Sequence, residues 1–440
     1  MKTPMLTRRQ LLLSSLFGAG YVGLRTLATG LPASFLLSPR RALAGGMSAC
    51  PSSDKAQYII FQTSGLGDPI NASVPGTYED PKIVHCPDPG MAPTSLTIGG
   101  QSYMAAAPWA SLPQNVLDRT TFFHLMTDTP VHPKEPDVLK LMETITGSEM
   151  LPSLLAKTLA PCLGTIQSQP ITLGAASPSE GLTYGGQALP IIPALALKAT
   201  LTNPAGPLTD LQTLRDSTLS QMYDLYKNTA TPAQRAYIDS LVTSQSQVRN
   251  IRQDLLDQLT SIEDNTPASQ IIAAVALIQM KVTPVVAIHI PFGGDNHRDP
   301  ALATEGTETI AGVASIAQLM AALSTAGLSD QVTLVSLNVF GRTLGPGNTD
   351  GRQHNPNHQV SIAIGKPFRG GVIGGLQPIG NDYGCLPIDS KSGAGTPSGD
   401  IATGNTLASF GKTLLASVGT DPSVISSQIS LGTVIAPALA

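Results

Sequence analysis

Charged and aromatic residues are scarce in this sequence of 440 residues. Asp, Glu, Lys and Arg together make up only 13% of the chain, about half of the roughly 25% found in typical soluble domains. This scarcity excludes a coiled coil, which needs many Glu and Lys residues. The 42% hydrophobic content argues against a solvated disordered chain. The single Trp argues against an aromatic platform on which nucleic acid bases stack.

The basic residues are unevenly distributed along the chain. Residues 1–44 contain six basic residues and no acidic one, and the remaining chain has 20 basic and 30 acidic residues. Its net charge is therefore −10. Such a body repels nucleic acid phosphates and anionic lipid, so we expect no nucleic acid partner.

The first 44 residues have the pattern of a removable export signal. Residues 7–12, TRRQLL, resemble the twin-arginine motif of bacteria, and residues 42–44, ALA, form a small-residue cleavage site. The mildly apolar stretch between them contains an arginine and a proline, so it is a poor membrane span. We expect the twin-arginine translocase to export residues 45–440 to the periplasm or the medium, with no integral span left. An ordinary secretory signal with a chance Arg pair is the alternative.

Cysteine is also scarce, with four residues, Cys50, Cys86, Cys162 and Cys385. Their spacings match no zinc knuckle or redox pair, so we give them no metal role. An even number in an exported protein permits two disulfides, in three possible connectivities. Residues 47–50 faintly resemble a lipoprotein box, but Met47 stands where Leu is normal. We therefore do not expect lipid anchoring at Cys50.

Apolar runs rich in β-forming residues alternate with helical patterns along the mature chain. The predicted strands span residues 57–61, 120–126, 282–290, 332–337 and 359–364. The predicted helices span residues 133–142, 269–280 and 304–328, and residues 208–263 predict a helical hairpin insertion. Residues 69–115 and 170–198, rich in loop-forming residues, are expected to be mostly irregular. The alternation predicts one α/β domain over 45–440, with a mainly parallel sheet sandwiched by helices.

Asp and His residues gather in three loops beside these strands. Asp68 follows the first strand in a Gly-rich loop, and Asp295 and His297 follow a later strand. His354 and His358 lie in a loop that precedes the last predicted strand. Chemistry in such folds lies at the carboxyl ends of strands, and Asp and His are ligands that suit Zn, Mn or Fe. A shared metal site is one interpretation; turns and helix caps are the other.

A separate polar segment, residues 127–133, precedes the predicted helix at 133–142. It contains the hydroxyl of Thr129 and the imidazole of His132. The positive field of a helix N-terminus holds a phosphate or sulfate group well. Capping of the helix by Thr129 or Asp128 is the alternative.

Five segments in the carboxyl half resemble one bacterial family in their order and spacing. They are GGDNH at 293–297, AGLSD at 326–330, FGRT at 340–343, GRQHNP at 351–356 and RGGVIG at 369–374. The family, called domain of unknown function 1501, usually has D-T-H, E-F-G-R-T, G-R-D-H and K-G-G segments. The amino half agrees more loosely, so the resemblance covers most of the mature chain and is specific only within 290–375.

That family is similar to the alkaline phosphatase and sulfatase superfamily. This similarity implies an α/β sandwich, one or two metal ions and a hydroxyl-type nucleophile at a helix start. The ligands that it implies are Asp68, Asp295, His297 and His354. It also implies that Thr129 or His132 lies at the nucleophile and anion end of the site, and the alignment does not choose between them.

The sequence departs from the family pattern at two carboxylate positions. Gln353 stands where the family has Asp before His354, and Asn338 stands near the position of the Glu in E-F-G-R-T. Each change removes a charged ligand for a divalent cation. We therefore expect one ion, of Zn, Mn, Fe or Ca, or none. His358 matches no family position and is either a replacement ligand or a turn cap.

Two functions follow from these observations. The first is an exported metal-dependent hydrolase that acts on a small phosphate or sulfate ester, with Arg342 or Arg352 stabilising the developing negative charge. The second is a catalytically inactive protein of the same fold that binds or assembles a cell-envelope component.

Overall fold

The computed structural model describes residues 55–175, 181–202 and 253–440, and five single residues between 221 and 235. The predicted signal peptide at 1–44 and Cys50 lie outside these residues. So does most of the predicted helical insertion at 208–263, of which α10 (Gln253–Thr260) is described as a helix.

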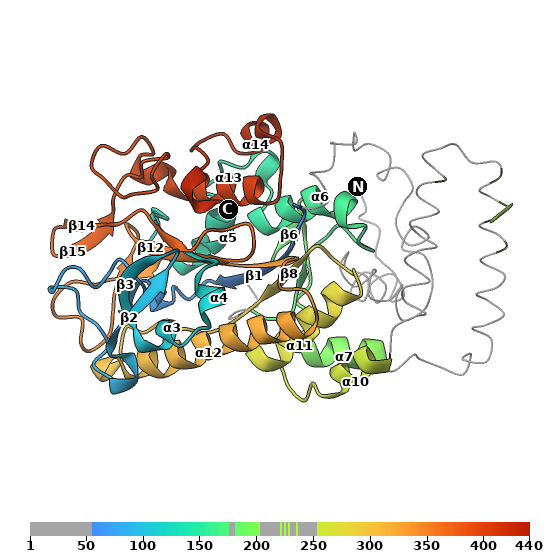
Figure 1. The fold of residues 1–440 in the computed structure, drawn as a ribbon, viewed down its shortest axis with the longest axis horizontal. Coiled ribbons are helices and arrows are strands. Elements are labelled where there is room, and N and C mark those ends of the chain that lie inside the picture. Colours follow the sequence, from blue (N-terminus) through green and yellow to red (C-terminus); the bar gives the residue numbers. More distant parts are fainter. Residues whose placement is uncertain are drawn as a thin grey trace, which may run out of the picture.

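A seven-stranded sheet forms the centre of the molecule (Figure 1). Its order is β13-β4-β12-β9-β1-β8-β5. The strands are β1 (Tyr58–Ser64), β4 (Thr120–Leu125), β5 (Ile171–Thr172), β8 (Val285–Ile288), β9 (Val332–Asn338), β12 (Gln359–Ile364) and β13 (Gly371–Ile373). All pairings in this sheet are parallel except those of β12, which is antiparallel to both neighbours. The predicted α/β class with a mainly parallel sheet is confirmed.

Helices cover both faces of the sheet (Figure 1). One face packs against α3 (Ala107–Ala110), α4 (Gln114–Leu117), α7 (Ala194–Thr202), α10, α11 (Pro267–Gln279) and α12 (Ala303–Thr325). The other packs against α5 (Glu135–Leu139), α6 (Leu151–Leu163), α13 (Thr406–Ser417) and α14 (Pro422–Gln428). Side chains alternate between these two cores: Ile60 and Phe122 belong to the first, whereas Phe61 and Phe123 belong to the second. This alternation follows from the two-residue period of a strand.

The two segments predicted to be irregular contain short elements. Residues 69–115 contain η2 (Pro69–Ala72), the hairpin β2 (Pro93–Ile98) with β3 (Gln101–Ala106), helix α3 and the start of α4. Within β2 only Leu96 and Ile98 are buried. Its apolar pattern was therefore too short to predict a strand from the sequence. Residues 170–198 contain β5, the hairpin β6 (Thr183–Tyr184) with β7 (Gln187–Ala188), and the start of α7.

The predicted helix at 133–142 is shorter than expected. It consists of the 3-10 turn η4 (His132–Lys134) and the five-residue helix α5. Leu141, Met142 and Glu143 have positive φ angles, so the chain leaves the right-handed helical region directly after α5. Two further hairpins, β10 (Gly341–Arg342) with β11 (His354–Asn355) and β14 (Leu376–Ile379) with β15 (Asp382–Cys385), complete the carboxyl half.

Among the described residues, one helical segment, Pro300–Thr325, is long and apolar enough to cross a membrane. Val313, Ile316 and Leu319 on this helix are buried in the core. The helix therefore covers the sheet here, as the core helix of a folded domain does.

The cysteines form no disulfide within the described part of the chain. Cys86 and Cys385 are buried, and neither is bonded to the other or to Cys162. A two-disulfide arrangement would join two of these three, so this structure excludes it.

We predict that Ile362→Ala in β12 lowers the free energy of unfolding by about 2–5 kcal/mol, because the substitution leaves a cavity. Ile362 is 2% exposed in the first core. The measurement is urea unfolding followed by circular dichroism. Leu431→Ala, at a residue that is 49% exposed, is the control and should change stability little. Equal effects of the two variants would contradict the assigned core.

Candidate metal centre

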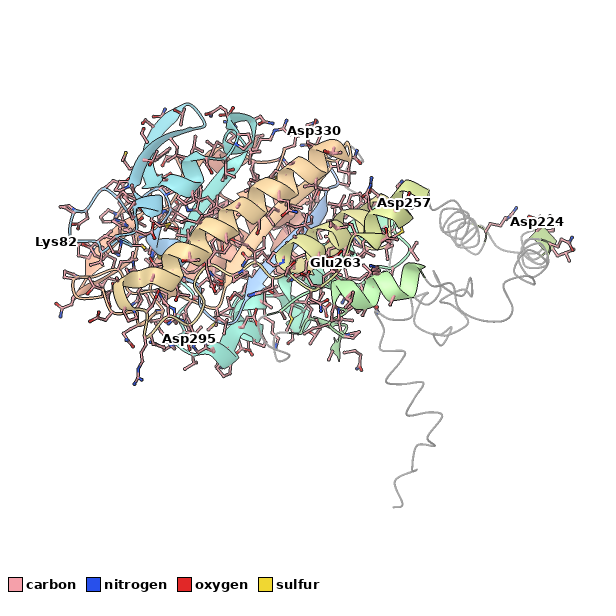
Figure 2. The ribbon with its side chains drawn as sticks, turned by 90° about the horizontal axis from the view of Figure 1, so that it is seen from below. Lys82, Asp224, Asp257, Glu263, Asp295 and Asp330 are labelled. Carbon is pink, nitrogen blue, oxygen red and sulfur yellow. The ribbon has the colours of Figure 1, made fainter. Side chains whose placement is uncertain are left out.

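Five polar segments meet at the carboxyl edge of the parallel strands. The loops after β1, β4, β8 and β9 reach this edge because those four strands run in the same direction. His354 precedes its strand, β12, but β12 runs antiparallel to its neighbours. The start of β12 therefore lies at the same edge. Figure 2 shows Asp295 at one end of α12 and Asp330, which precedes β9, at the other end.

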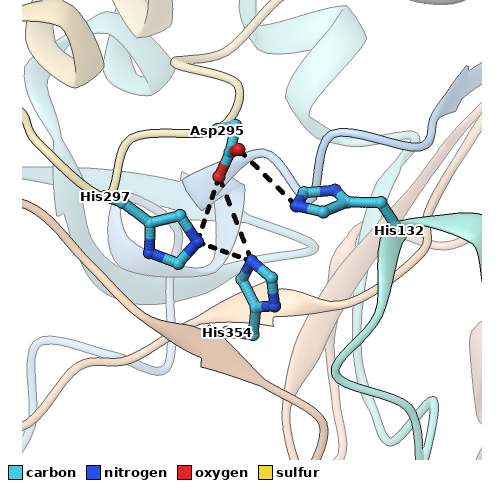
Figure 3. Close-up of side chains that lie close together, drawn as sticks. All are labelled: His132, Asp295, His297 and His354. Atoms are coloured by element: carbon cyan, nitrogen blue, oxygen red, sulfur yellow. Dashed lines mark hydrogen bonds and ion pairs between the residues drawn. The ribbon is translucent and has the colours of Figure 1, made fainter.

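Four side chains at this edge point toward one another: His132, Asp295, His297 and His354 (Figure 3). Their ligand atoms all lie within 4.8 Å of one another. The Nε2 atoms of His297 and His354 are 2.7 Å apart. Oδ1 of Asp295 is 3.3 Å from Nε2 of His297 and 3.9 Å from that of His354. Oδ2 of Asp295 is 3.6 Å from Nε2 of His132.

Hydrogen bonds to the backbone orient two of the histidines. Nδ1–H of His132 donates to the carbonyl of Gly65 at 2.7 Å, and Nδ1–H of His354 donates to the carbonyl of Pro130. In the neutral imidazole the other nitrogen, Nε2, then carries a lone pair. Both lone pairs point toward the carboxylate of Asp295, where a bound cation would accept them. Metal-binding histidines are usually oriented in this way.

The spacing of the four side chains fits one metal ion. Zn–N and Zn–O bonds of about 2.0–2.2 Å put neighbouring tetrahedral ligand atoms roughly 3.3–3.6 Å apart. Four of the separations between ligand atoms in the structure, 2.7, 3.3, 3.6 and 3.9 Å, lie on either side of this range or within it. Three imidazoles and one carboxylate are a donor set for Zn, Mn or Fe rather than Ca or Mg, which prefer oxygen ligands alone. Within the described residues this is the one such cluster.

The cluster is open to solvent on one side. The side chains of Asp295, His297, His132 and His354 are 44%, 37%, 31% and 20% exposed. Phe340 forms the wall on the protein side: its ring is fully buried, stacks on His354 at 4.2 Å and touches the edge of His132 at 5.0 Å. Gly67, with a φ of 66°, lies against the same ring, and a side chain there would collide with it.

Arg342 holds the Asp295 carboxylate in place. Its guanidinium is fully buried and donates to Oδ1 of Asp295 at 2.9 Å. It also donates to the carbonyls of Leu66, Gly67 and Gly294 at 2.6, 2.5 and 3.2 Å. Arg342 was expected to stabilise charge on a substrate. Because all of these partners belong to the protein, it instead joins the loops that follow β1 and β8.

The electrostatics favour the protonation states that bind metal. Burial alone would raise the pKa of Asp295, but the hydrogen bond and charge of Arg342, with the charges of His132 and His297, hold it below its usual range. Burial lowers the pKa of His354, and the charge of Arg342 lowers it further. An ionised Asp295 and a neutral His354 are therefore the dominant forms at neutral pH.

Asp68 lies outside the cluster, contrary to the expected ligand set. It is 1% exposed, and its Oδ1 accepts from the backbone amides of Phe292 and Gly294 at 3.2 and 2.9 Å. The Gly-rich loop does turn the carboxylate back over the sheet edge. There it fixes the loop that carries Asp295 and His297, so its role in this structure is to support the ligands.

The other residues expected to do chemistry are engaged elsewhere. Thr129 is buried and accepts from the amide of Val131 at 3.4 Å, and neither Thr129 nor Asp128 caps η4 or α5. Arg352 is fully buried in an ion pair with Glu305 at 2.6 Å. His132, expected at the nucleophile and anion end, belongs to the ligand cluster instead.

The two departures from the family pattern also lie outside the cluster. Gln353 is exposed, and its backbone amide donates to the hydroxyl of Thr343. Asn338 is buried and its amide donates to the carbonyl of Asp68 at 3.4 Å. His132 was singled out from the sequence, in the polar segment 127–133 between β4 and α5, but it was not identified as a ligand.

His358 is neither a ligand nor a turn cap. It is fully buried, with Nε2 2.9 Å from Nδ1 of His124 and Nδ1 3.2 Å from the side-chain nitrogen of Asn71. His124 Nε2–H donates to the carbonyl of Pro75, so Nδ1 of His124 is an acceptor. His358 therefore donates to His124 through Nε2–H and accepts from the amide of Asn71 through Nδ1. Asn71 also exchanges two hydrogen bonds with the backbone of Arg342, at 2.8 and 3.0 Å. Asn71 and His124 were not identified from the sequence.

A scan against models of known protein families finds no match to this chain, and a search of curated proteins finds no similar one.

We predict that Arg342→Lys weakens metal binding by about 10–100-fold, the usual effect of losing a residue that orients a metal ligand. A lysine cannot reproduce the fork of the guanidinium that joins Asp295 to three carbonyls. Isothermal titration with Zn²⁺ measures the affinity. Arg298→Lys is the control, because Arg298 is exposed beside His297. Equal Zn²⁺ affinities in the two variants would show that Arg342 does not position the site.

We predict that stability falls as the pH drops from 6.5 to about 4. Burial lowers the pKa of His124 from 6.5 to about 4 and that of His358 well below 6.5. Between these values the unfolded chain binds more protons than the folded one, so acid favours unfolding. For His124 the loss is on the order of 3 kcal/mol.

Urea unfolding at pH 7.5, 6.5, 5.5 and 4.5 measures this slope. The His124→Gln variant should be less stable at pH 7.5 and lose less stability toward pH 4.5. An unchanged slope in His124→Gln would contradict the buried neutral pair.

Proposed function

We propose that the protein is an exported, metal-dependent hydrolase of phosphate or sulfate esters, with the alkaline phosphatase and sulfatase type of α/β fold. The observation that carries this proposal is the partly exposed cluster of His132, Asp295, His297 and His354 at the carboxyl edge of the sheet. Ligands of α/β sheets bind at this edge. The export signal predicted from the sequence, and the segments that resemble the domain of unknown function 1501 family, support the proposal.

The chain would act on the ester through the residues that hold and support the ion. Zn, Mn or Fe bound here would polarise an ester oxygen and lower the pKa of a water. Asp295 would bind the ion as a carboxylate, because Arg342 keeps it ionised and oriented. Phe340 would keep water from the inner side of His354. The exposed side of the cluster would receive the anionic group of a small ester.

A second candidate function is a metal-binding envelope protein without catalysis. The specific observation in its favour is the number of ligands: four protein groups saturate a tetrahedral ion, as in structural sites. The two buried arginines also favour a protein without catalysis, because both Arg342 and Arg352 are paired within the protein. Neither can contact a substrate in this structure.

Elemental analysis of the purified protein and a hydrolysis assay with aryl phosphate and aryl sulfate test these functions. We expect about one equivalent of metal and turnover that chelation removes. His354→Ala should lose both, because it removes one ligand and its support from Pro130. His289→Ala is the control: His289 is a half-buried histidine outside the cluster and should keep both properties.

Each outcome selects one function. Turnover that is intact in His354→Ala would reject a hydrolase at this site. Bound metal without turnover on either ester would favour the envelope-binding protein.

A further inference from the structure

The four ligand side chains are not held equally. His132 and His354 each donate through Nδ1–H to a backbone carbonyl, of Gly65 and Pro130 respectively. Asp295 accepts from the buried guanidinium of Arg342 at 2.9 Å. These three side chains are each fixed from behind by a group outside the cluster, so they are pre-organised to bind an ion.

His297 has no such support. Among the described residues, its side chain forms polar contacts only with two members of the cluster, Asp295 at 3.3 Å and His354 at 2.7 Å. Its Nδ1 has no hydrogen-bond partner among the described residues, and its side chain is 37% exposed. No hydrogen bond from outside the cluster therefore fixes the rotation of this ring.

The proton positions distinguish His297 further. Nε2 of His354 carries a lone pair, because Nδ1–H of the same ring donates to Pro130. The 2.7 Å contact between the two Nε2 atoms then requires His297 to be the donor. His297 thus carries a proton on the nitrogen that faces the cluster.

The backbone at His297 is fixed, so only its side chain is free to move. Gly351, with a φ of 123°, packs directly against the carbonyl of His297. The amide of Arg352 donates to the carbonyl of Asn296 at 3.0 Å. A change of side-chain rotamer would therefore move the ring without breaking these backbone contacts.

We propose that His297 is the exchangeable ligand of the metal centre. His132, Asp295 and His354 form the permanent set, and His297 gives up its place to the oxygen of a phosphate or sulfate group. This inference rests on the proposed function. It reconciles four protein ligands with catalysis, because a catalytic site needs an open position.

Metal and phosphate titrations of three single variants test the inference. His297→Ala should bind Zn²⁺ within about tenfold of the unmodified protein, whereas His132→Ala and His354→Ala should lose roughly 100-fold or more. When the unmodified protein is loaded with Co²⁺ as a coloured probe, the binding of inorganic phosphate should change its visible absorption. The apparent affinity for phosphate should be about tenfold higher in His297→Ala than in the unmodified protein, because phosphate no longer competes with the imidazole.

The results separate this inference from the proposed function. If His297→Ala loses as much metal affinity as His354→Ala, or if phosphate binds no better to it, His297 is a permanent ligand and the inference is overturned. Circular dichroism of each variant shows whether a loss comes from unfolding. If the unmodified protein binds neither Zn²⁺ nor Co²⁺, the metal centre itself fails, and with it the proposed function.

Discussion

The buried guanidinium of Arg342 is the interaction on which the organisation of the site depends. A fully buried positive charge is costly unless charged and polar groups surround it. Here it is surrounded by the carbonyls of the loops after β1 and β8 and by the carboxylate of Asp295. Removing one of these partners would leave the buried guanidinium without part of its compensation. The hydrogen bonds of the guanidinium therefore also hold two loops together. The loop after β8 carries Asp295 and His297, and the loop after β1 carries Asp68, which supports them.

This arrangement extends from the site into the sheet. The backbone of Arg342 is held by Asn71, and Asn71 leads through His358 to His124 on β4. Each donor in this chain meets one acceptor, so the direction of every hydrogen bond is determined. A buried network with all members satisfied is rigid, whereas one missing partner leaves a costly unpaired group. The rigidity of the ligand loops thus originates in a neutral polar network beneath them.

Much of the fold could be predicted from the sequence because its strands are apolar runs with clear ends. The strand predicted at 359–364 coincides with β12, and the helix predicted at 304–328 contains nearly all of α12. The hairpin β2–β3 was missed because only Leu96 and Ile98 of β2 face the core. The direction of β12 could not be read from the sequence either. Without it, nothing explained how a loop that precedes a strand could join loops that follow strands.

The site was predictable only in part, for a physical reason. Asp295, His297 and His354 stand beside strand ends, and local pattern is enough to propose them. Asp68 has the same pattern but turns its carboxylate to the amides of Phe292 and Gly294. A carboxylate that accepts backbone hydrogen bonds and one that binds metal look alike in a sequence. The choice depends on which loop packs against it, and that is set by residues more than 200 positions away.

The unequal support of the four ligands bears on how such a site could work. A site in which every ligand is anchored from behind favours one geometry and resists exchange. In the proposal above, a site with one unsupported imidazole alternates between two arrangements, with the ring bound or turned out to solvent. Because the backbone of His297 is packed against Gly351, the difference between them is confined to one side chain. An incoming anion then needs to displace only that ring, and the loops held by Arg342 stay in place.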